Sequence, residues 1–329
     1  MASYHVVGVA GVGMSAVAEL LLQRGDRVSG SDRLLDRGVD SPVVAVLRRR
    51  GLAVVAQDGS GVRRGLDAVI VSTAIEESNP DIDAARRLGL AVRHRSAMVA
   101  EFVQGRSCLA VAGTSGKSTV TGMAGYILSK LGADPTVING AALLNWAGAE
   151  ATGSTRLGRD GPAVLEADES DRSLLRFEPD WAVITNISAD HFDLAESEAL
   201  FDRFRSQVKR ACITTSDARY APDAPPETGP RGSRFRYRGH LVNLGIPGQH
   251  NVANAISAIE ACALAGCDRG RAAGALEGFR GMQRRLEHVG TARGIAVFDD
   301  YAHNPAKIRA TWSTLHAAFA RVHCVWRPH

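Results

Sequence analysis

Short apolar runs alternate with amphipathic stretches along the N-terminal third of the chain. The apolar run at 4–9 predicts a strand, the spacing at 14–24 predicts a helix, and 27–31 predicts a second strand. This order indicates a parallel sheet, because parallel neighbours need a crossover connection such as a helix. Further helices and strands are predicted in alternation at 42–50, 53–56, 67–72, 82–88, 91–93 and 96–103.

A second alternating region follows the polar segment 104–107, which we interpret as a linker. Its pattern predicts strands and helices at 108–111, 120–131, 163–165, 181–185, 197–208, 211–214 and 252–264. Residues 221–232 contain four prolines and are predicted to be turn and loop. The last part of the chain predicts a third strand–helix–strand unit, at 294–299, 305–319 and 322–326.

The segment between the strand at 108–111 and the following helix carries the strongest chemical signal. It reads Ala112-Gly113-Thr114-Ser115-Gly116-Lys117-Ser118-Thr119. A glycine turn between a strand and a helix presents backbone N–H groups and the positive end of the helix dipole to phosphates. Gly116 allows the close approach, Lys117 supplies a cation to the β- and γ-phosphates, and Ser118 offers a hydroxyl to Mg²⁺. Val111 stands where the general motif has glycine, so the loop is of a shortened type. The chain is therefore predicted to bind a nucleoside triphosphate.

The fold class is predicted as α/β with more than one domain, because 329 residues exceed one ordinary hydrophobic core. We assign residues 1–107 to an N-terminal Rossmann-like domain and residues 108–286 to a central ATPase domain with a parallel sheet around the phosphate-binding loop. Residues 287–329 are expected to be the beginning of a third Rossmann-like α/β domain, truncated at its C-terminal end.

Composition excludes several other classes. The net charge of +4 is only mildly basic, and the short arginine clusters at 48–50 and 63–64 lack interleaved aromatic residues, which disfavours a nucleic-acid partner. No apolar run reaches the length of a membrane span, and the N-terminus lacks the pattern of a signal peptide. The five cysteines form no CxxC pair, and Cys108, Cys212 and Cys324 lie in apolar, strand-like stretches. We therefore expect reduced, buried thiols and a cytoplasmic protein without a membrane partner.

A glycine-rich turn, residues 8–13, follows the first predicted strand. A dinucleotide fingerprint would place glycines at 8, 10 and 13 with an acid about twenty residues on. Here position 10 is alanine, the extra glycine is Gly11, and Asp32 stands at a plausible distance. Rossmann-type nucleotide binding and a tight turn without a ligand both remain open. Residues 72–75 end another strand at the sheet edge where such folds bind ligands, which favours the first interpretation.

Polar residues also follow two strands of the second region. Four acids lie in the segment Glu166-Ala167-Asp168-Glu169-Ser170-Asp171, which suits a hard cation but could also be a solvated turn. The next strand is followed by Asp190 and His191, and a single histidine in this position is more often structural than metal-binding. The acidic segment at the end of the neighbouring strand favours His191 as a metal ligand.

Two amides, Asn251 and Asn254, lie three residues apart at the start of the helix at 252–264. They could read the edge of a purine, or Asn251 could simply cap the helix. Arg284, Arg285 and the polar segment 299–305 complete the set. Taken singly, these residues are more often surface arginines and a turn that starts a helix at Pro305 than parts of a site.

Taken together, these segments resemble the Mur ligases, and among them the type that joins L-alanine to UDP-N-acetylmuramate. The resemblance covers nearly the whole chain. It rests on residues 5–15, 29–32, 72–75, 79–80, 94–95, 113–118, 166–171, 185–186, 190–191, 247–254, 284–285 and 299–305.

The resemblance implies an ATP-dependent ligase of peptidoglycan synthesis that uses Mg²⁺ and has UDP-N-acetylmuramate and L-alanine as substrates. It implies that Lys117, Glu166 and His191 are catalytic, and that Ser118, Glu166 and His191 bind metal ions, with His191 at a second Mg²⁺. It further implies an ATP site and a UDP-sugar site. The ATP site comprises Gly113, Thr114, Ser115, Gly116, Lys117, Ser118, Thr119, Asn251, Asn254, Arg285 and Asp300. The UDP-sugar site comprises Gly11, Gly13, Ser15, Asp32 and Ser72.

The chain departs from the family pattern at several points. The family usually has histidine at the positions of Ser115 and Asn304 and glycine at that of Ala10, and the stretch from 212 to 247 is shorter than usual. Two alternatives follow: a Mur-type paralogue that joins another acid or amino acid, and a non-catalytic protein that binds nucleotide and UDP-sugar. A nicotinamide-dependent dehydrogenase is a third, and it would leave the phosphate-binding loop unexplained. The sequence leaves the oligomeric state open.

Overall fold

The computed structural model describes residues 1–327, which form two compact units. The first unit comprises Met1–Gly105 together with two later segments, Ile138–Ala142 and Trp146–Leu157, and the second comprises the rest of the chain. None of the helices in the described part is both long and apolar enough to cross a membrane.

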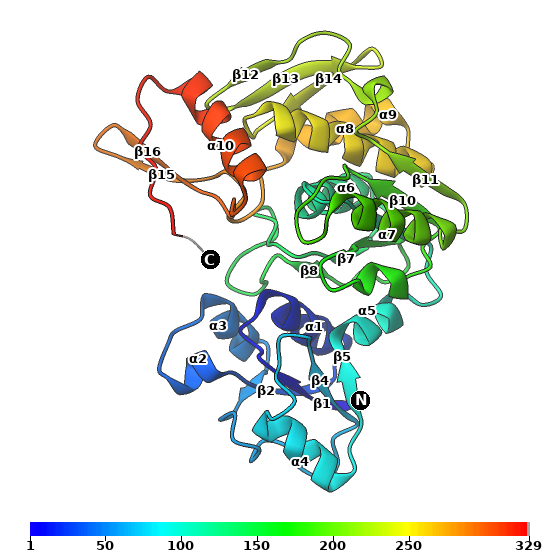
Figure 1. Ribbon diagram of the computed structural model, residues 1–329, viewed down its shortest axis with the longest axis vertical. Helices are drawn as coiled ribbons and strands as arrows, with labels where there is room; N and C mark the ends of the chain where they lie inside the picture. Colours follow the sequence, from blue (N-terminus) through cyan, green and yellow to red (C-terminus); the bar gives the residue numbers. More distant parts are fainter. Residues whose placement is uncertain (328–329) are drawn as a thin grey trace. The chain divides into compact units, whose positions relative to one another are not determined.

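The first unit is built on a five-stranded sheet in the order β3-β2-β1-β4-β5, with every neighbouring pair parallel (Figure 1). Its strands are β1 (Ser3–Val7), β2 (Arg27–Ser31), β3 (Ala53–Val54), β4 (Ala68–Val71) and β5 (Val92–His94). Its helices are α1 (Val12–Arg24), α2 (Arg33–Asp36), α3 (Pro42–Arg49), α4 (Pro80–Leu88) and α5 (Arg95–Val103). The order reverses direction at β1, so the glycine turn after β1 lies at a topological switch point, where open α/β sheets bind ligands.

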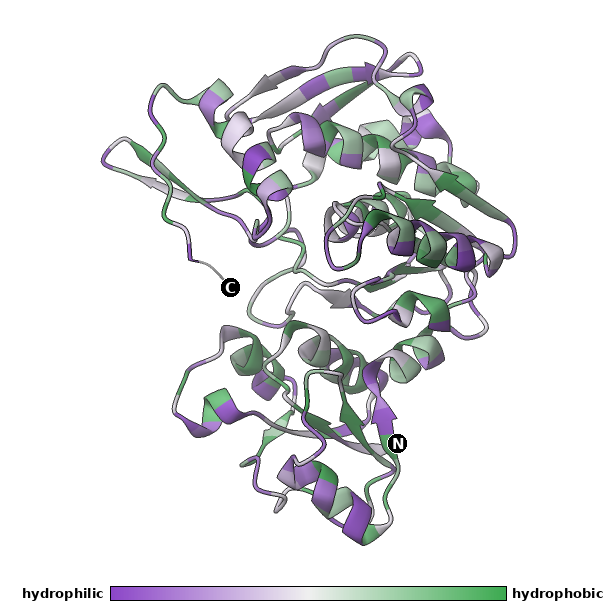
Figure 2. Cartoon of the chain, viewed as in Figure 1, coloured by the Kyte–Doolittle hydropathy of each residue, from purple (hydrophilic) through white to green (hydrophobic). Residues whose placement is uncertain are grey.

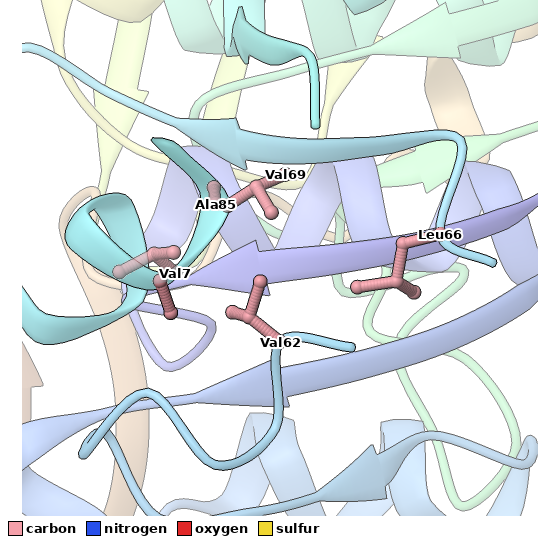
Figure 3. Packing of buried hydrophobic residues seen from close by; sticks show 6 residues of the cluster. Val7, Val62, Leu66, Val69 and Ala85 are labelled. Carbon is pink, nitrogen blue, oxygen red and sulfur yellow. The ribbon is translucent and has the colours of Figure 1, made fainter. Parts of the chain in front are cut away.

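One layer of this unit's core is a cluster that includes Val7, Val62, Leu66, Val69 and Ala85, seen from close by in Figure 3. Val7 and Val69 come from adjacent strands and are fully buried. Burying such side chains contributes about 1.5–3 kcal/mol each relative to exposure. The cluster therefore fixes α4 and the segment before β4 against the sheet.

The segment 146–157 belongs to the first unit because of a buried carboxylate on α1. Glu19 is fully buried and accepts hydrogen bonds from the backbone N–H of Thr152 at 3.0 Å and from Thr155 Oγ1 at 2.8 Å. An isolated buried carboxylate would be very costly, and these donors satisfy it. Residues 138–142 and 146–157, assigned to the central domain from the sequence, thus pack with the N-terminal unit.

The second unit has a sheet in the order β11-β10-β6-β9-β7-β8, of which β11, β10, β6 and β9 pair in parallel. The strands of this sheet are β6 (Cys108–Ala112), β7 (Thr136–Ile138), β9 (Ala163–Glu166), β10 (Trp181–Ile184), β11 (Ala211–Thr214) and the edge strand β8 (Thr155–Arg156), which lies in the segment grouped with the first unit. Its α-helices up to residue 275 are α6 (Lys117–Lys130), α7 (Leu194–Ser206), α8 (Gln249–Leu264) and α9 (Arg269–Ala275). Three short 3₁₀ helices are η1 (Ser173–Arg176), η2 (Ala218–Tyr220) and η3 (Leu276–Gly278).

The central strands of both parallel sheets are largely apolar along their length, as Figure 2 shows. All five residues of β6 are buried, and α6 is buried from Ser118 to Leu128. A strand covered on both faces needs such a continuous apolar run. The α/β fold class with parallel sheets predicted from the sequence is confirmed.

Two sequence predictions were wrong in the last part of the chain. Residues 221–232, predicted as loop, contain β12 (Glu227–Gly229), which pairs antiparallel with β13 (Gly232–Tyr237), itself followed by β14 (His240–Leu244). Three of the four prolines precede β12 and the fourth lies in the turn to β13, so none of them removes a hydrogen bond from the ladder.

The predicted strand at 294–299 and helix at 305–319 are present as β16 (Ile295–Asp299) and α10 (Pro305–Ala318), but β16 pairs antiparallel with the unpredicted strand β15 (Glu287–Ala292). Residues 322–326 form no strand, because no strand of the described chain pairs with them. For the same reason Cys324, expected to be buried, is exposed, while Cys108 is buried as expected. The last two residues of the predicted third domain, 328–329, lie outside the described part of the chain.

Candidate functional site

The phosphate-binding loop connects β6 to α6 and depends on two glycines with positive φ. Gly113 has φ +124° and Gly116 has φ +86°, values that residues with a side chain rarely adopt. A Cβ on Gly113 would lie 2.9 Å from the backbone nitrogen of Thr185, and one on Gly116 would collide with the side-chain oxygen of Asn254. The structure therefore explains both glycines by a bent backbone and by close neighbours.

The loop is held from the other side by the segment that follows β10. The backbone N–H of Thr114 donates to the carbonyl of Asn186 at 3.0 Å, and that of Ser115 donates to Asn186 Oδ1 at 3.1 Å. Thr185 Oγ1 donates to the carbonyl of Ser115 at 2.6 Å, and Thr114 Oγ1 donates to the carbonyl of Ser188 at 3.1 Å. Parallel strands end at one edge of the sheet, which is why residues so far apart in the sequence meet here.

Lys117 begins α6 and forms an ion pair with Glu169. Its Nζ lies 2.6 Å from Glu169 Oε2 and 3.8 Å from Asp168 Oδ1, and both Lys117 and Glu169 are largely withdrawn from solvent. Burial alone would lower the pKa of Lys117, but the charges of Glu169, Asp168 and Glu166 outweigh it and raise that pKa above its ordinary value. Lys117 is thus a fixed positive charge at the end of the loop.

Ser118 and Glu166 lie together beside this lysine. Ser118 Oγ donates to Glu166 Oε1 at 3.0 Å, and the Arg285 guanidinium donates to the same hydroxyl at 3.3 Å. A hydroxyl and a carboxylate oxygen are hard donors of the kind that Mg²⁺ prefers, and a nucleotide's phosphates and water would supply the other oxygens. The pair therefore fits one Mg²⁺, although among residues 1–327 no three histidine, cysteine, aspartate or glutamate side chains converge as a metal site.

The amide pair lies at the start of α8. Asn251 Nδ2 donates to the carbonyl of Pro247 at 2.7 Å, and Asn254 Nδ2 donates to Asn251 Oδ1 at 3.2 Å. Gly248 is the N-cap of α8, so Asn251 does not cap this helix. Asn254 reaches the phosphate-binding loop at Gly116, whereas Asn251 mainly orients Asn254.

Asp300, between β16 and α10, binds the backbone next to Arg285, which precedes β15. The Asp300 carboxylate accepts hydrogen bonds from the backbone N–H groups of Leu286 at 2.8 Å and Ala302 at 2.7 Å, and from Thr311 Oγ1 at 3.1 Å. The Arg285 guanidinium also lies over the ring of Tyr301, 5.2 Å from its centroid. Asp300 therefore fixes the segment from which Arg285 extends to Ser118.

His191 follows Asp190 in the same segment that holds the phosphate-binding loop. Asp190 Oδ2 accepts a hydrogen bond from Lys307 Nζ at 2.9 Å. Burial alone would raise the pKa of Asp190, but hydrogen bonds from Lys307 and Asn304 lower it. Of the three residues expected to bind metal, Ser118 and Glu166 are joined by a hydrogen bond, whereas His191 lies beside Asp190 in the segment after β10.

The glycine turn of the first unit uses the residues expected to bind a UDP-sugar. Gly8 and Val9 donate their N–H groups to the carbonyl of Ser31, and Ala10 donates to Asp32 Oδ2 at 3.0 Å. Asp32 also caps α2 by accepting a hydrogen bond from the N–H of Leu34, so its carboxylate joins the glycine turn to the start of α2. Gly11 is the N-cap of α1, Ser15 is buried and donates to the carbonyl of Val12, and Ser72 directly follows β4.

Three site residues were missed in the sequence-based assignment. Arg95 lies beside Gly13, where a Cβ would be 2.7 Å from its guanidinium. Glu169 pairs with Lys117, and Lys307 pairs with Asp190. The signal for Glu169 was its place in the acidic segment, but no spacing rule identifies which of four acids faces a lysine.

Comparison with known proteins decides the family. The family models described as "Mur ligase family, catalytic domain", "Mur ligase middle domain" and "Mur ligase, glutamate ligase domain" match residues 3–107, 111–202 and 284–327. A UDP-N-acetylmuramate–L-alanine ligase from Solibacter usitatus is 36% identical over 99% of this chain and 74% of its own length. The chain belongs to the Mur ligase family. A relative of the same name from Mycolicibacterium gilvum is also 36% identical to this Mur ligase, over 100% of this chain and 77% of the relative.

Solved structures agree. The UDP-N-acetylmuramate–alanine ligase from Thermotoga maritima matches this Mur ligase with a TM-score of 0.86 at 27% identity, over 98% of this chain and 79% of that one. A murein peptide ligase from Psychrobacter arcticus gives 0.79 at 25% identity, over 96% and 76%. The predicted family is confirmed, and so is the enzyme class, an ATP-dependent ligase of peptidoglycan synthesis.

Proposed function

We propose that this Mur ligase joins the carboxylate of UDP-N-acetylmuramate to the amine of L-alanine, with ATP as the third substrate. The observation that carries the proposal is the group of Lys117, Ser118 and Glu166 at one sheet edge. It is supported by relatives with the alanine-ligase name at 36% identity.

A carboxylate is a poor acyl donor until one of its oxygens is converted into a leaving group. In the proposed reaction the carboxylate oxygen attacks the γ-phosphorus of ATP, which gives an acyl phosphate and ADP. The L-alanine nitrogen then attacks the carbonyl carbon, and the tetrahedral intermediate expels phosphate while the nitrogen loses its proton. Positioning and charge neutralisation account for most of the catalysis in such transfers.

We assign the phosphoryl transfer to the second unit. Backbone N–H groups of residues 113–119 bind the phosphates, and Lys117 and Arg285 neutralise the charge that spreads over the transferring group. Mg²⁺, when bound, would be held by Ser118 and Glu166 and would supply positive charge to the phosphates during the transfer. Asn251 and Asn254 are assigned to the adenine side, and Asp300 keeps Arg285 in place for the nucleotide.

We assign the UDP-sugar to the glycine turn of the first unit. Gly11, Gly13, Ser15, Asp32 and Ser72 lie around the ends of β1, β2 and β4. The N-terminus of α1 there presents free backbone N–H groups and a positive dipole end to a pyrophosphate. A cytoplasmic location is part of the proposal, and the buried free thiols of Cys108 and Cys262 support it.

The test is ADP formation by the purified chain with ATP, Mg²⁺, UDP-N-acetylmuramate and L-alanine, with each left out in turn. Formation that requires all four supports the proposal. Formation without L-alanine dependence contradicts it, and binding of both nucleotides without turnover would identify a non-catalytic binding protein.

A second candidate is a ligase that accepts a peptide in place of L-alanine. The match to the murein peptide ligase, with a TM-score of 0.79, favours including it. The same assay with a murein tripeptide as the amine separates the two, because the better amine substrate will have the higher kcat/KM.

A further inference from the structure

The ammonium of Lys307 pairs with Asp190, the residue directly before His191, which the family resemblance implies binds a second divalent cation. Lys307 is in the first turn of α10, and its ammonium lies 2.9 Å from Asp190 Oδ2. Both side chains are mostly withdrawn from solvent, with 20% and 11% of their surface exposed. A pair this sheltered is a fixed part of the site rather than a fluctuating surface contact.

The lysine is also positioned by its own helix. Asn304 is the N-cap of α10, and its Oδ1 accepts a hydrogen bond from the backbone N–H of Lys307 at 2.9 Å. Asn304 also contributes a hydrogen bond to Asp190. The first turn of α10 thus presents one amide and one ammonium to the same carboxylate.

Asp190 belongs to the segment that supports the phosphate-binding loop. Two residues before it, Ser188 exchanges hydrogen bonds with Thr114 at 3.0 and 3.1 Å. His191 follows directly, so the carboxylate that adjoins His191 already has a cationic partner. A divalent ion bound through this carboxylate would have to share it with an ammonium of the same sign, which repels the ion.

The donor set beside His191 therefore does not fit the second Mg²⁺ that the resemblance implies. We infer that the ammonium of Lys307 takes the place of this second cation, so that the ligase binds one divalent ion per nucleotide. That ion is held by Ser118 and Glu166. A lysine at this position supplies the positive charge that the developing acyl phosphate needs, and it does so without metal exchange. The inference rests on the proposed function only in taking the nucleotide to be ATP.

The test counts manganese ions by electron paramagnetic resonance, with the full chain and a non-hydrolysable ATP analogue at saturation. The wild-type chain is expected to bind one Mn²⁺. Lys307→Ala removes the ammonium, frees Asp190 and should raise the count to two, whereas Lys307→Arg keeps the charge and should stay at one. Lys130→Ala is the matched control. It removes a lysine at the C-terminal end of α6, away from the phosphate-binding loop at its N-terminal end, and should leave the count at one.

Two Mn²⁺ in the wild-type chain would overturn the inference, and so would one Mn²⁺ in Lys307→Ala. No Mn²⁺ bound with the nucleotide would overturn it as well. Glu166→Gln should lower the wild-type count to zero, which identifies the single ion with the phosphate-binding loop. Because the count needs neither UDP-sugar nor amino acid, a chain that binds one Mn²⁺ but fails to form ADP contradicts the proposed function and leaves this inference standing.

Discussion

The ammonium of Lys117 lies 2.6 Å from Oε2 of Glu169, so the phosphate-binding lysine has a carboxylate partner within its own unit. Glu169 is 4% exposed, and its other oxygen, Oε1, is buried without a hydrogen-bond partner in the described chain. A carboxylate satisfied at only one oxygen is held mainly by its cation. The phosphates of a nucleotide must therefore compete with Glu169 for Lys117.

Replacing Glu169 by glutamine should tighten nucleotide binding. Glu169→Gln removes the competing charge and leaves a side chain of the same size, so Lys117 is free for the phosphates. We expect the Kd for ATP, measured by calorimetry without Mg²⁺, to fall about 5- to 30-fold, which corresponds to roughly 1–2 kcal/mol. Asp168→Asn is the matched control, since Asp168 is 3.8 Å from Lys117 and more exposed, and its effect should be smaller. Equal effects of the two substitutions would show that general repulsion, not the Lys117–Glu169 pair, controls affinity.

Removing the lysine should abolish phosphoryl transfer and spare the other substrate. Lys117→Ala is expected to reduce kcat for ADP formation at least about a hundredfold, because a charge aimed at the transferring group is lost. The Kd for UDP-N-acetylmuramate should stay within about twofold, because the residues assigned to that substrate lie in the first unit and Lys117 lies in the second. An assay of ADP formation measures kcat, and calorimetry measures the Kd for UDP-N-acetylmuramate. A parallel loss of UDP-sugar binding would contradict the assignment of the two sites to separate units.

The chemistry near the phosphate-binding loop could be predicted from the sequence because it follows from strand order. Glu166 ends β9 and Ser118 follows β6, and these adjacent parallel strands end at the same edge. The proximity of Ser118 and Glu166 could therefore be predicted from the strand order and the phosphate-binding motif alone. The pairing of Glu169 with Lys117 depended on the fold of a turn, which carries no periodic signal.

The parts that could not be predicted depend on distant contacts. The segment 146–157 follows the phosphate-loop helix in sequence, but Glu19 binds it to the first unit across more than a hundred residues. The strand at 295–299 was predicted, but its partner is β15 in an antiparallel register, with Glu287 opposite Asp299 and Ala292 opposite Ile295. Apolar alternation alone does not distinguish a parallel strand from one arm of a hairpin.

The close packing around Gly113 predicts a large effect of a single methyl group. Gly113→Ala should lower the free energy of unfolding by clearly more than the cost of the left-handed backbone alone, which is about 1–2 kcal/mol. Its Cβ would lie 2.9 Å from the Thr185 backbone nitrogen, so β10 would have to shift. Gly132→Ala is the matched control, because Gly132 has φ +85° and nothing within 4 Å of a Cβ. Urea denaturation measures both variants, and equal losses would mean that the crowding at Gly113 is relieved without cost.

A buried carboxylate in the first unit should make stability depend on pH. Asp81 is fully buried and accepts hydrogen bonds from Ser31 Oγ at 2.5 Å and from the N–H of Gly59 at 2.9 Å, with His5 Nε2 3.2 Å away. Burial alone would raise the pKa of Asp81, but these partners lower it below its ordinary value of 3.8. Because the folded pKa is the lower one, the ionised carboxylate stabilises the fold above pH 3.8, and this contribution is lost as the pH falls through the folded pKa.

Asp81→Asn should therefore destabilise the chain at pH 7, by about 1–3 kcal/mol. The difference from wild type should shrink as the pH falls below about 3.8. Urea denaturation at pH 7, 5 and 3.5 measures this, with Asp40→Asn as an exposed control that should have little effect at any of the three.

Asp81 also holds the turn assigned to the UDP-sugar, through Ser31. The Ser31 hydroxyl donates to Asp81, and the Ser31 carbonyl accepts hydrogen bonds from the N–H groups of Gly8 and Val9. Asp81→Asn should accordingly weaken UDP-N-acetylmuramate binding at pH 7 while leaving the Kd for ATP unchanged. Weaker binding of both nucleotides would mean that the substitution disturbs the whole chain rather than this turn.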